Sequence, residues 1–378
     1  MYAASNAFHT AVRNGNPQRI LLIFPDAVFG NGDVDVTSGV EFNEYFNTEE
    51  DLCIGQALSN EISFSLFNDY GDLNAYEFGE FTATLGVQLT DAPYTETANC
   101  SASYGQDTYT GHNTSPYIKK NGSAMPSQPS FPVKSILVHD GTVYAFGASG
   151  QCRKWTGNTG STVTLNDFML RKAVAWSGKG FGYNSSTRIL KERDGTREKI
   201  YEFVPLGVFT AERPKVPDII KLDFHCHDRM LKLDKDMPAP ETLNMTYPST
   251  VANLFEKICT YFAVPYLTST FINSTATIAE EPEEFANTTA RTVVSWIAEA
   301  AGSNARFDRD GKLVMDWVRN SGVSMDESGY AKFLPYWYET QTVSKLRNRA
   351  TDGTDETGYG SGNVEYLIQD NPILRGCE

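Results

Sequence analysis

The residues with the clearest capacity for chemistry are His225-Cys226-His227, which lie in a segment with strand-like alternation. Side chains two apart in a strand project from the same face, so His225 and His227 could hold one zinc ion between their imidazoles. Zinc peptidases that use such a pair also need a His-x-x-x-Asp pair upstream. The upstream histidines and the residues four positions later are His9 with Arg13, His112 with Pro116, and His139 with Val143. We therefore interpret His225 and His227 as polar residues on an exposed strand face, and expect neither a metal nor another cofactor.

No other catalytic pattern is recognisable. The chain has no Gly-x-Ser-x-Gly turn, and Ser177-Gly178-Lys179-Gly180 lacks the glycine spacing and the Ser or Thr of a P-loop. The six cysteines include no Cys-x-x-Cys pair and are typical of isolated buried thiols. With 47 acidic residues, any two named as acid and base would be arbitrary. The sequence predicts a protein that is not an enzyme.

A set of aromatic residues has the chemistry of a sugar-binding platform, because neighbouring Asn, Asp and Thr side chains supply hydrogen-bonding groups. The set is Tyr144, Trp155, Trp176 and Tyr183. The alternative is that these rings fill the core of a small β domain that has few aliphatic side chains. We favour the core interpretation, and Trp155, Trp176 and Tyr183 remain the candidates for glycan binding.

The elements that must position these residues are mostly strands. Residues 3–14 form a short amphipathic helix in our prediction. Alternation in residues 61–66 and 81–87 predicts half-buried strands, and we expect a meander of about six antiparallel strands over residues 1–95. After Leu89 and up to Phe131 the only large aliphatic or thioether side chains are Ile118 and Met125. We interpret that stretch as an exposed loop or linker, with short strands returning after it.

Two one-sided apolar stripes predict helices in the later part of the chain. The first spans about residues 249–263 with Ser249 as its N-cap, and the second spans about 289–301 and ends at Gly302. We expect only these two helices to exceed two turns. A hairpin follows around Asp310-Gly311. Residues 240–318 therefore read as an α+β unit in a chain whose strands are mostly antiparallel.

Composition indicates a folded, acidic, β-rich protein. A length of 378 residues favours two to four domains, and 22 Phe, 19 Tyr and 30 Gly favour strands. The net charge of −15 leaves no basic surface for phosphates, which argues against nucleic-acid binding by counterion release. No run approaches the ~18 apolar residues of a membrane span. The fold class is mainly β with an α+β domain.

Three stretches, in this order and at these distances, resemble the hub protein at the tip of a phage tail tube. The first runs from MYAASNAFHTAVRNGNPQRILLIF to FGEFTATLGV, the second is VPLGVFTAERPKVPD, and the third is ARTVVSWIAEAAGSNARFDRDGKLVM. The resemblance covers about residues 1–90 and 200–375. It implies a structural virion protein at the tail tip or baseplate, assembled in the cytoplasm of a bacterial host.

Hubs of this family are homotrimers in which each protomer contributes two β-barrels to a ring, so the trimer can dock on a sixfold ring. The implied partners are two further copies of the chain, a hexameric distal tail protein or tube ring, the tape-measure protein, and a tail fibre or tip protein. DNA passes through the channel without specific binding.

The resemblance also implies a division into domains. Residues 1–95 with 200–238 form the first tube-type barrel, 240–318 the α+β domain, and 319–378 a second barrel, either incomplete or completed by another chain. Residues 96–199 are a β-rich insertion on the outer side. The alternative function is an adhesin or carbohydrate-binding tail protein that acts through residues 96–199.

Overall fold

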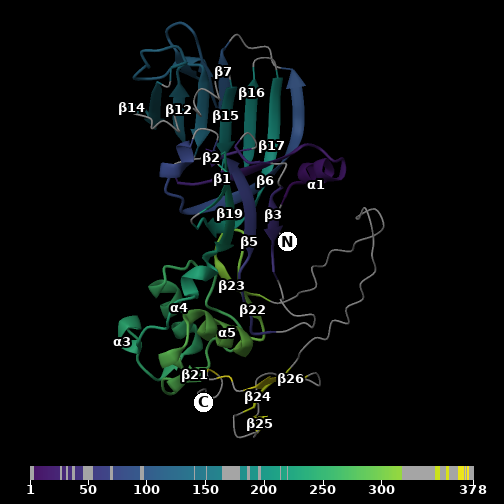
Figure 1. Cartoon of the computed structure of the whole chain (residues 1–378), viewed down its shortest axis with the longest axis vertical. Helices are drawn as coiled ribbons and strands as arrows, with labels where there is room; N and C mark the ends of the chain where they lie inside the picture. Colours follow the sequence, from purple (N-terminus) through teal and green to yellow (C-terminus); the bar gives the residue numbers. More distant parts are fainter. Residues whose placement is uncertain are drawn as a thin grey trace.

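The structure is a computed structural model that describes most of the chain (Figure 1). The described residues are 4–25, 28–30, 33–35, 39–45, 54–68, 71–93, 98–139, 141–149, 151–163, 179–184, 188–194, 197–212, 214–218, 220–316, 345–349, 355–356, 365–369, 371 and 373. Strands dominate these residues, and the mainly β class with a helical part is confirmed. No helix among them is both long and apolar enough to cross a bilayer.

The first unit is a curled sheet built from both sides of the inserted region. Its strands are β1 (Gln18–Ile23), β2 (Val28–Phe29), β3 (Glu41–Asn43), β5 (Glu61–Phe67), β6 (Glu80–Pro93), β17 (Arg197–Thr210), β18 (Lys215–Asp218) and β19 (Lys221–Asp228). β6 pairs with β1 and β17, β17 with β19, and β19 with β5. The predicted consecutive meander is wrong, because β5 and β6 do not pair with each other: β5 lies between β3 and β19, and β6 lies between β1 and β17.

One face of this sheet encloses an apolar core. Strand alternation directs aromatic rings inward from five strands and the loops beside them, and the rings pack in pairs. Phe24 stacks on Phe81 at 4.7 Å between ring centroids, and Phe64 stacks on Phe224 at 4.9 Å. Val34 forms an isolated antiparallel bridge with Leu66 of β5.

Helix α1 (Asn6–Arg13) lies against the outside of this sheet (Figure 1). The Ser5 hydroxyl caps it by accepting from the Phe8 amide at 3.0 Å. The predicted helix over 3–14 is therefore present but shorter. Its eight residues make about 2.2 turns, so α1 is a third helix longer than two turns. The expectation of only two such helices is therefore wrong.

The inserted region forms two β layers. The first contains β7 (Cys100–Tyr104), β8 (Asp107–Gly111), β9 (Ile118–Lys120) and β10 (Ser123–Ala124). The second contains β11 (Ser135–His139), β12 (Thr142–Phe146), β13 (Cys152–Thr156), β14 (Thr159–Val163), β15 (Lys179–Asn184) and β16 (Ile189–Asp194), and it continues the first unit's sheet through β16 and β17. The loop interpretation for Leu89 to Phe131 is wrong, because Ile118 and Met125 anchor a buried core there. Small residues on β7 and β15 let the two layers approach closely enough to enclose this core.

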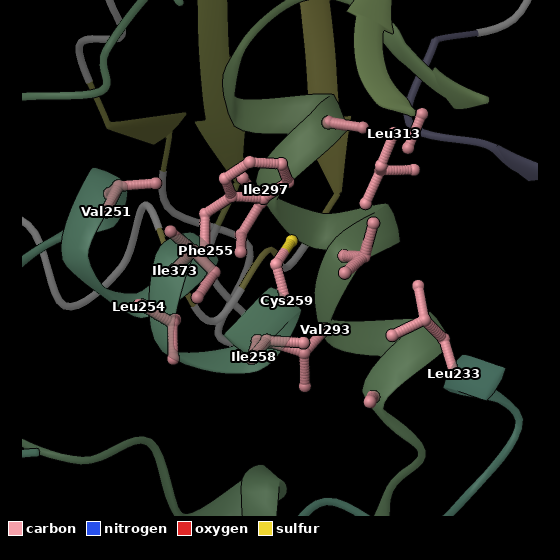
Figure 2. Packing of buried hydrophobic residues seen from close by; sticks show 14 of the residues in the cluster. Leu233, Val251, Leu254, Phe255, Ile258, Cys259, Val293, Ile297, Leu313 and Ile373 are labelled. Atoms are coloured by element: carbon pink, nitrogen blue, oxygen red, sulfur yellow. The ribbon is translucent and has the colours of Figure 1, made fainter. Parts of the chain in front are cut away.

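The α+β unit is built mainly from the chain after β19, with β4 contributed from before β5. It contains α3 (Pro240–Leu243), α4 (Val251–Tyr261), α5 (Ala290–Ala300), β4 (Ala57–Leu58), β20 (Ser249–Thr250), β21 (Thr277–Ile278), β22 (Asn304–Phe307), β23 (Leu313–Asp316) and short 3-10 turns at Arg229–Leu233 and Glu283–Asn287. A third 3-10 turn, Asp72–Ala75, lies in the first unit. Figure 2 shows the apolar faces of α4 and α5 packed together around residues such as Phe255 and Ile297. Both predicted helices are present.

The N-cap of α4 differs from the prediction by one residue. The Thr250 hydroxyl accepts from the Asn253 amide at 3.1 Å, whereas Ser249 and Thr250 both pair with β21 in the short strand β20. Thr289 caps α5, which begins one residue after the predicted start, and Gly302 has the left-handed φ of +61° after its end.

Most of the predicted second barrel, residues 319–378, lies outside the described residues. The described part is a three-stranded sheet of β24 (Lys345–Arg349), β25 (Asp355–Glu356) and β26 (Glu365–Gln369), together with Asn371 and Ile373. Ile373 is fully buried in the core of the α+β unit, as Figure 2 shows. The chain after β26 therefore returns to that unit.

Candidate functional site

The outer face of β5 and β19 carries the His225 and His227 pair. In the antiparallel register, Glu61 lies directly opposite His227 and Ser63 opposite His225. Directly opposed residues share a face of the sheet, so all four side chains lie together. Cys226 points the other way and is fully buried. Burial raises the pKa of the Cys226 thiol to about 12, so it remains a protonated core residue and not a ligand.

The side chains of this cluster converge. The two imidazole rings lie edge to face with centroids 4.8 Å apart. Glu61 Oε1 is 3.5 Å from His227 Nδ1, and Glu61 Oε2 is 3.9 Å from His225 Nε2. Ser63 Oγ lies 2.9 Å from His225 Nδ1. About a quarter of the Glu61 and His227 side chains and 57% of the His225 side chain are exposed, so ions in solution can reach the cluster.

Glu61 is the member that sequence reasoning missed. Its segment was predicted as a strand with one exposed face, which places Glu61 outward. The strand that lies beside it was not predictable from alternation. The structure thus converts a two-histidine candidate into a cluster of three potential metal ligands.

The order Ser63, His225, Glu61 also resembles a serine nucleophile with its base and acid. Acyl transfer needs donors aimed at a developing oxyanion. Ser63 sits in the middle of β5, between β3 and β19, so the backbone amides around it belong to the sheet ladders. The cluster is therefore suited to holding a cation and not to stabilising an oxyanion.

A shallow hollow adjoins the cluster on the same face of the sheet. It is lined by Gly39, Val40, Glu41, Ser63, Phe64, Ser65, Asp223 and Phe224. The Ser65 hydroxyl donates to Asp223 Oδ1 at 2.6 Å, and Glu41 lies opposite Ser63 in the register of β3 and β5. Two carboxylates beside the cluster make this surface locally negative, which favours cations.

The candidate glycan residues do not form an exposed platform among the described side chains. Trp155 is fully buried in the core of the inserted region, and its indole donates to the Pro126 carbonyl at 2.8 Å. Trp176 lies outside the described residues. Tyr183 belongs to β15, but its side chain is outside the described part of the chain.

A second charged group, Asp228, lies where β19 meets the α+β unit. Its carboxylate accepts from the amides of Asn60 at 2.8 Å and Met230 at 3.0 Å, and from the Ser59 hydroxyl at 3.1 Å. Burial nevertheless raises the pKa of Asp228 to about 6. These contacts cap the turn after β19 and give Asp228 a structural role.

The neighbouring Arg229 guanidinium pairs with Glu80 of β6 and also donates to the Gly311 carbonyl at 2.7 Å. Its hydrogen bond holds the pKa of the Glu80 carboxyl below its usual value. Arg229 therefore ties the curled sheet to the β22–β23 hairpin.

Comparison of this chain with protein-family models, curated proteins and solved structures finds no match in any of the three.

Proposed function

We propose that the protein is a structural virion component, the trimeric hub at the distal end of a phage tail tube. In this role it adapts a threefold tip to a sixfold tail ring and lines the channel for DNA and the tape-measure protein. One observation carries the proposal. FGEFTATLGV and VPLGVFTAERPKVPD, which carry the resemblance to hubs, are far apart in sequence but include paired strands: Leu85 lies opposite Val204, and Phe81 opposite Phe209.

The third hub-like stretch also packs next to the first unit. It forms α5 and the β22–β23 hairpin, and β22 pairs in parallel with β4, just before β5. The inserted region leaves and rejoins the first unit at Pro93 and Arg197, which face each other across β6 and β17. An insertion between adjacent strand ends leaves the first unit's sheet continuous, as the proposed lateral position of residues 96–199 requires.

Exposed apolar side chains support self-association of the first unit. Phe67 ends β5, Ile220 precedes β19, and Val216 lies on β18, with 38%, 45% and 64% of their surfaces exposed. Among the described strands, β18 has only β19 as a partner. Unpaired edges and apolar patches on a lone protomer promote association, and closed threefold symmetry would bury them.

The overall charge agrees with a channel lining. A protein with a net charge of −15 repels the DNA backbone, so DNA can slide past without adhering. The proposed partners remain a hexameric distal tail protein or tube ring, the tape-measure protein and a tail fibre or tip protein.

The proposal is tested by measuring the molar mass of the purified chain in solution by light scattering, with three copies expected. The double variant Val216→Glu/Ile220→Glu places charges in the proposed contact and should yield monomers. Leu267→Glu is the matched control, because Leu267 is 60% exposed but lies in the α+β unit, outside the proposed contact. A monomeric wild-type protein, or particles holding one or six copies per tail, would exclude the hub role.

The inserted region has a core of its own, which favours a separate binding role as the second candidate function. As an adhesin, the full chain should bind a glycan array, and a variant without residues 94–196 should not. If the chain forms trimers but binds no glycan, the adhesin role is excluded and only the hub role is supported.

A further inference from the structure

Three donor groups converge on one point of the outer sheet face. Glu61 comes from β5, and His225 and His227 come from the neighbouring β19. Their potential ligand atoms all lie within 4.8 Å of one another. Tetrahedral zinc with bonds of about 2.0–2.1 Å places its ligand atoms about 3.3 Å apart. The 3.5 Å between Glu61 Oε1 and His227 Nδ1 is already close to that spacing, and small side-chain rotations bring in His225.

Ser63 supplies a partner for the imidazole of His225. Metal-binding histidines use one ring nitrogen for the metal and donate the other N–H to an oxygen, which fixes the ring. The tautomer of His225 with hydrogen on Nδ1 donates to Ser63 Oγ at 2.9 Å and leaves the Nε2 lone pair facing Glu61. The sheet therefore orients His225 for a ligand at Nε2.

We propose that Glu61, His225 and His227 bind one divalent transition-metal ion, with Zn²⁺ as the first candidate. Two imidazoles and a carboxylate are a ligand set that zinc accepts, with a fourth position open to water. Mg²⁺ and Ca²⁺ prefer all-oxygen sites of six or more ligands, so they are excluded as the main occupants. The partial exposure of all three side chains gives the ion a path from solvent.

The bound ion would link β5 to β19 across the sheet. Binding to the folded chain alone stabilises that state by mass action, so the melting temperature should rise with metal concentration. This site goes beyond the proposed hub function and does not depend on it, because all three ligands come from one chain.

The test uses the full chain, freed of metal by a chelator and titrated with ZnCl₂ in a calorimeter. We expect one Zn²⁺ per chain, and Co²⁺ in its place should give the visible absorption of a four-coordinate site. The double variant His225→Ala/His227→Ala should lose this binding, and Glu61→Gln should weaken it without altering the fold. His9→Ala is the matched control, because His9 lies exposed on α1, away from the cluster. This variant should still bind one Zn²⁺ per chain.

Ser63 is a positioning residue, and its variants separate orientation from ligation. Ser63→Ala should keep one Zn²⁺ per chain but weaken the affinity by about 10–100-fold, and Ser63→Thr should restore it.

Three results would overturn the proposal. They are absence of Zn²⁺ binding by the wild-type chain, unchanged stoichiometry in the double-histidine variant, and displacement of Zn²⁺ by excess Mg²⁺, which indicates a general acidic surface.

Discussion

The backbones of β7 and β15 approach each other closely in the inserted region, and this contact allows a specific prediction. A Cβ atom added at Gly182 of β15 would lie 1.8 Å from the backbone oxygen of Ser103 on β7, and one at Gly180 would lie 2.0 Å from that of Ser101. Both obstacles are backbone atoms, so no side-chain rotation can relieve the overlap. Gly182→Ala must therefore move β7 away from β15. Overpacking costs about 1–3 kcal/mol, and separating the layers also loosens the core that holds Trp155.

We expect Gly182→Ala to lower the free energy of unfolding by about 3 kcal/mol, at the upper end of that range, since backbone must shift. Denaturant unfolding followed by tryptophan fluorescence measures it. Gly79→Ala is the control, because no heavy atom lies within 4 Å of its added Cβ. The control should be neutral or stabilise by about 0.4–1 kcal/mol through the unfolded state. If Gly182→Ala has the same free energy of unfolding as the control, β7 and β15 do not pack as closely as in this structure.

Three further predictions concern the first and α+β units. Burial raises the pKa of Asp228 from 3.8 to about 6, so its protonated form stabilises the fold below about pH 4, and this contribution is lost as the pH rises through 6. Asp228→Asn should flatten the fall in stability between pH 4 and 7, measured by denaturant titration at each pH; an unchanged slope would contradict the assignment. Thr250→Ala removes the N-cap of α4 and should cost about 1 kcal/mol in thermal unfolding, while no loss would mean that water replaces the hydroxyl. Ile373→Ala should cost about 2–5 kcal/mol, because Ile373 is fully buried among α4 and α5; a cost under about 0.5 kcal/mol would place it outside that core.

Local features of the fold were predictable from the sequence. The stripe of Val251, Leu254, Phe255 and Ile258 predicts one buried helix face, and all four are fully buried. Gly302 predicts the end of α5, because glycine has no Cβ and adopts the left-handed conformation of a helix terminus without a steric penalty. These signals lie within two helical turns of chain, so they can be read from nearby positions alone.

The inserted region shows why composition misled the interpretation. The stretch from Leu89 to Phe131 is rich in small and polar residues, which is typical of loops. In the structure, Ser101, Ser103 and the glycines of β15 let two backbones approach closely, and that contact replaces large side chains. A few anchors such as Ile118 then suffice to fill the core. Which small residues face each other depends on long-range pairing, and composition carries no information about it.

The same limit hid Glu61. Alternation in β5 and β19 assigns each residue to a face, but it does not identify the neighbouring strand or the register. A slip of one residue between these strands would turn Glu61 toward the core and separate it from His225 and His227. Zinc binding that requires all three side chains would therefore exclude such a one-residue slip, since the observed pairing brings them together on one face. β19 also follows the hub-like stretch that begins at Val204, so this register constrains how the two segments of the first unit assemble, whether or not the chain forms trimers.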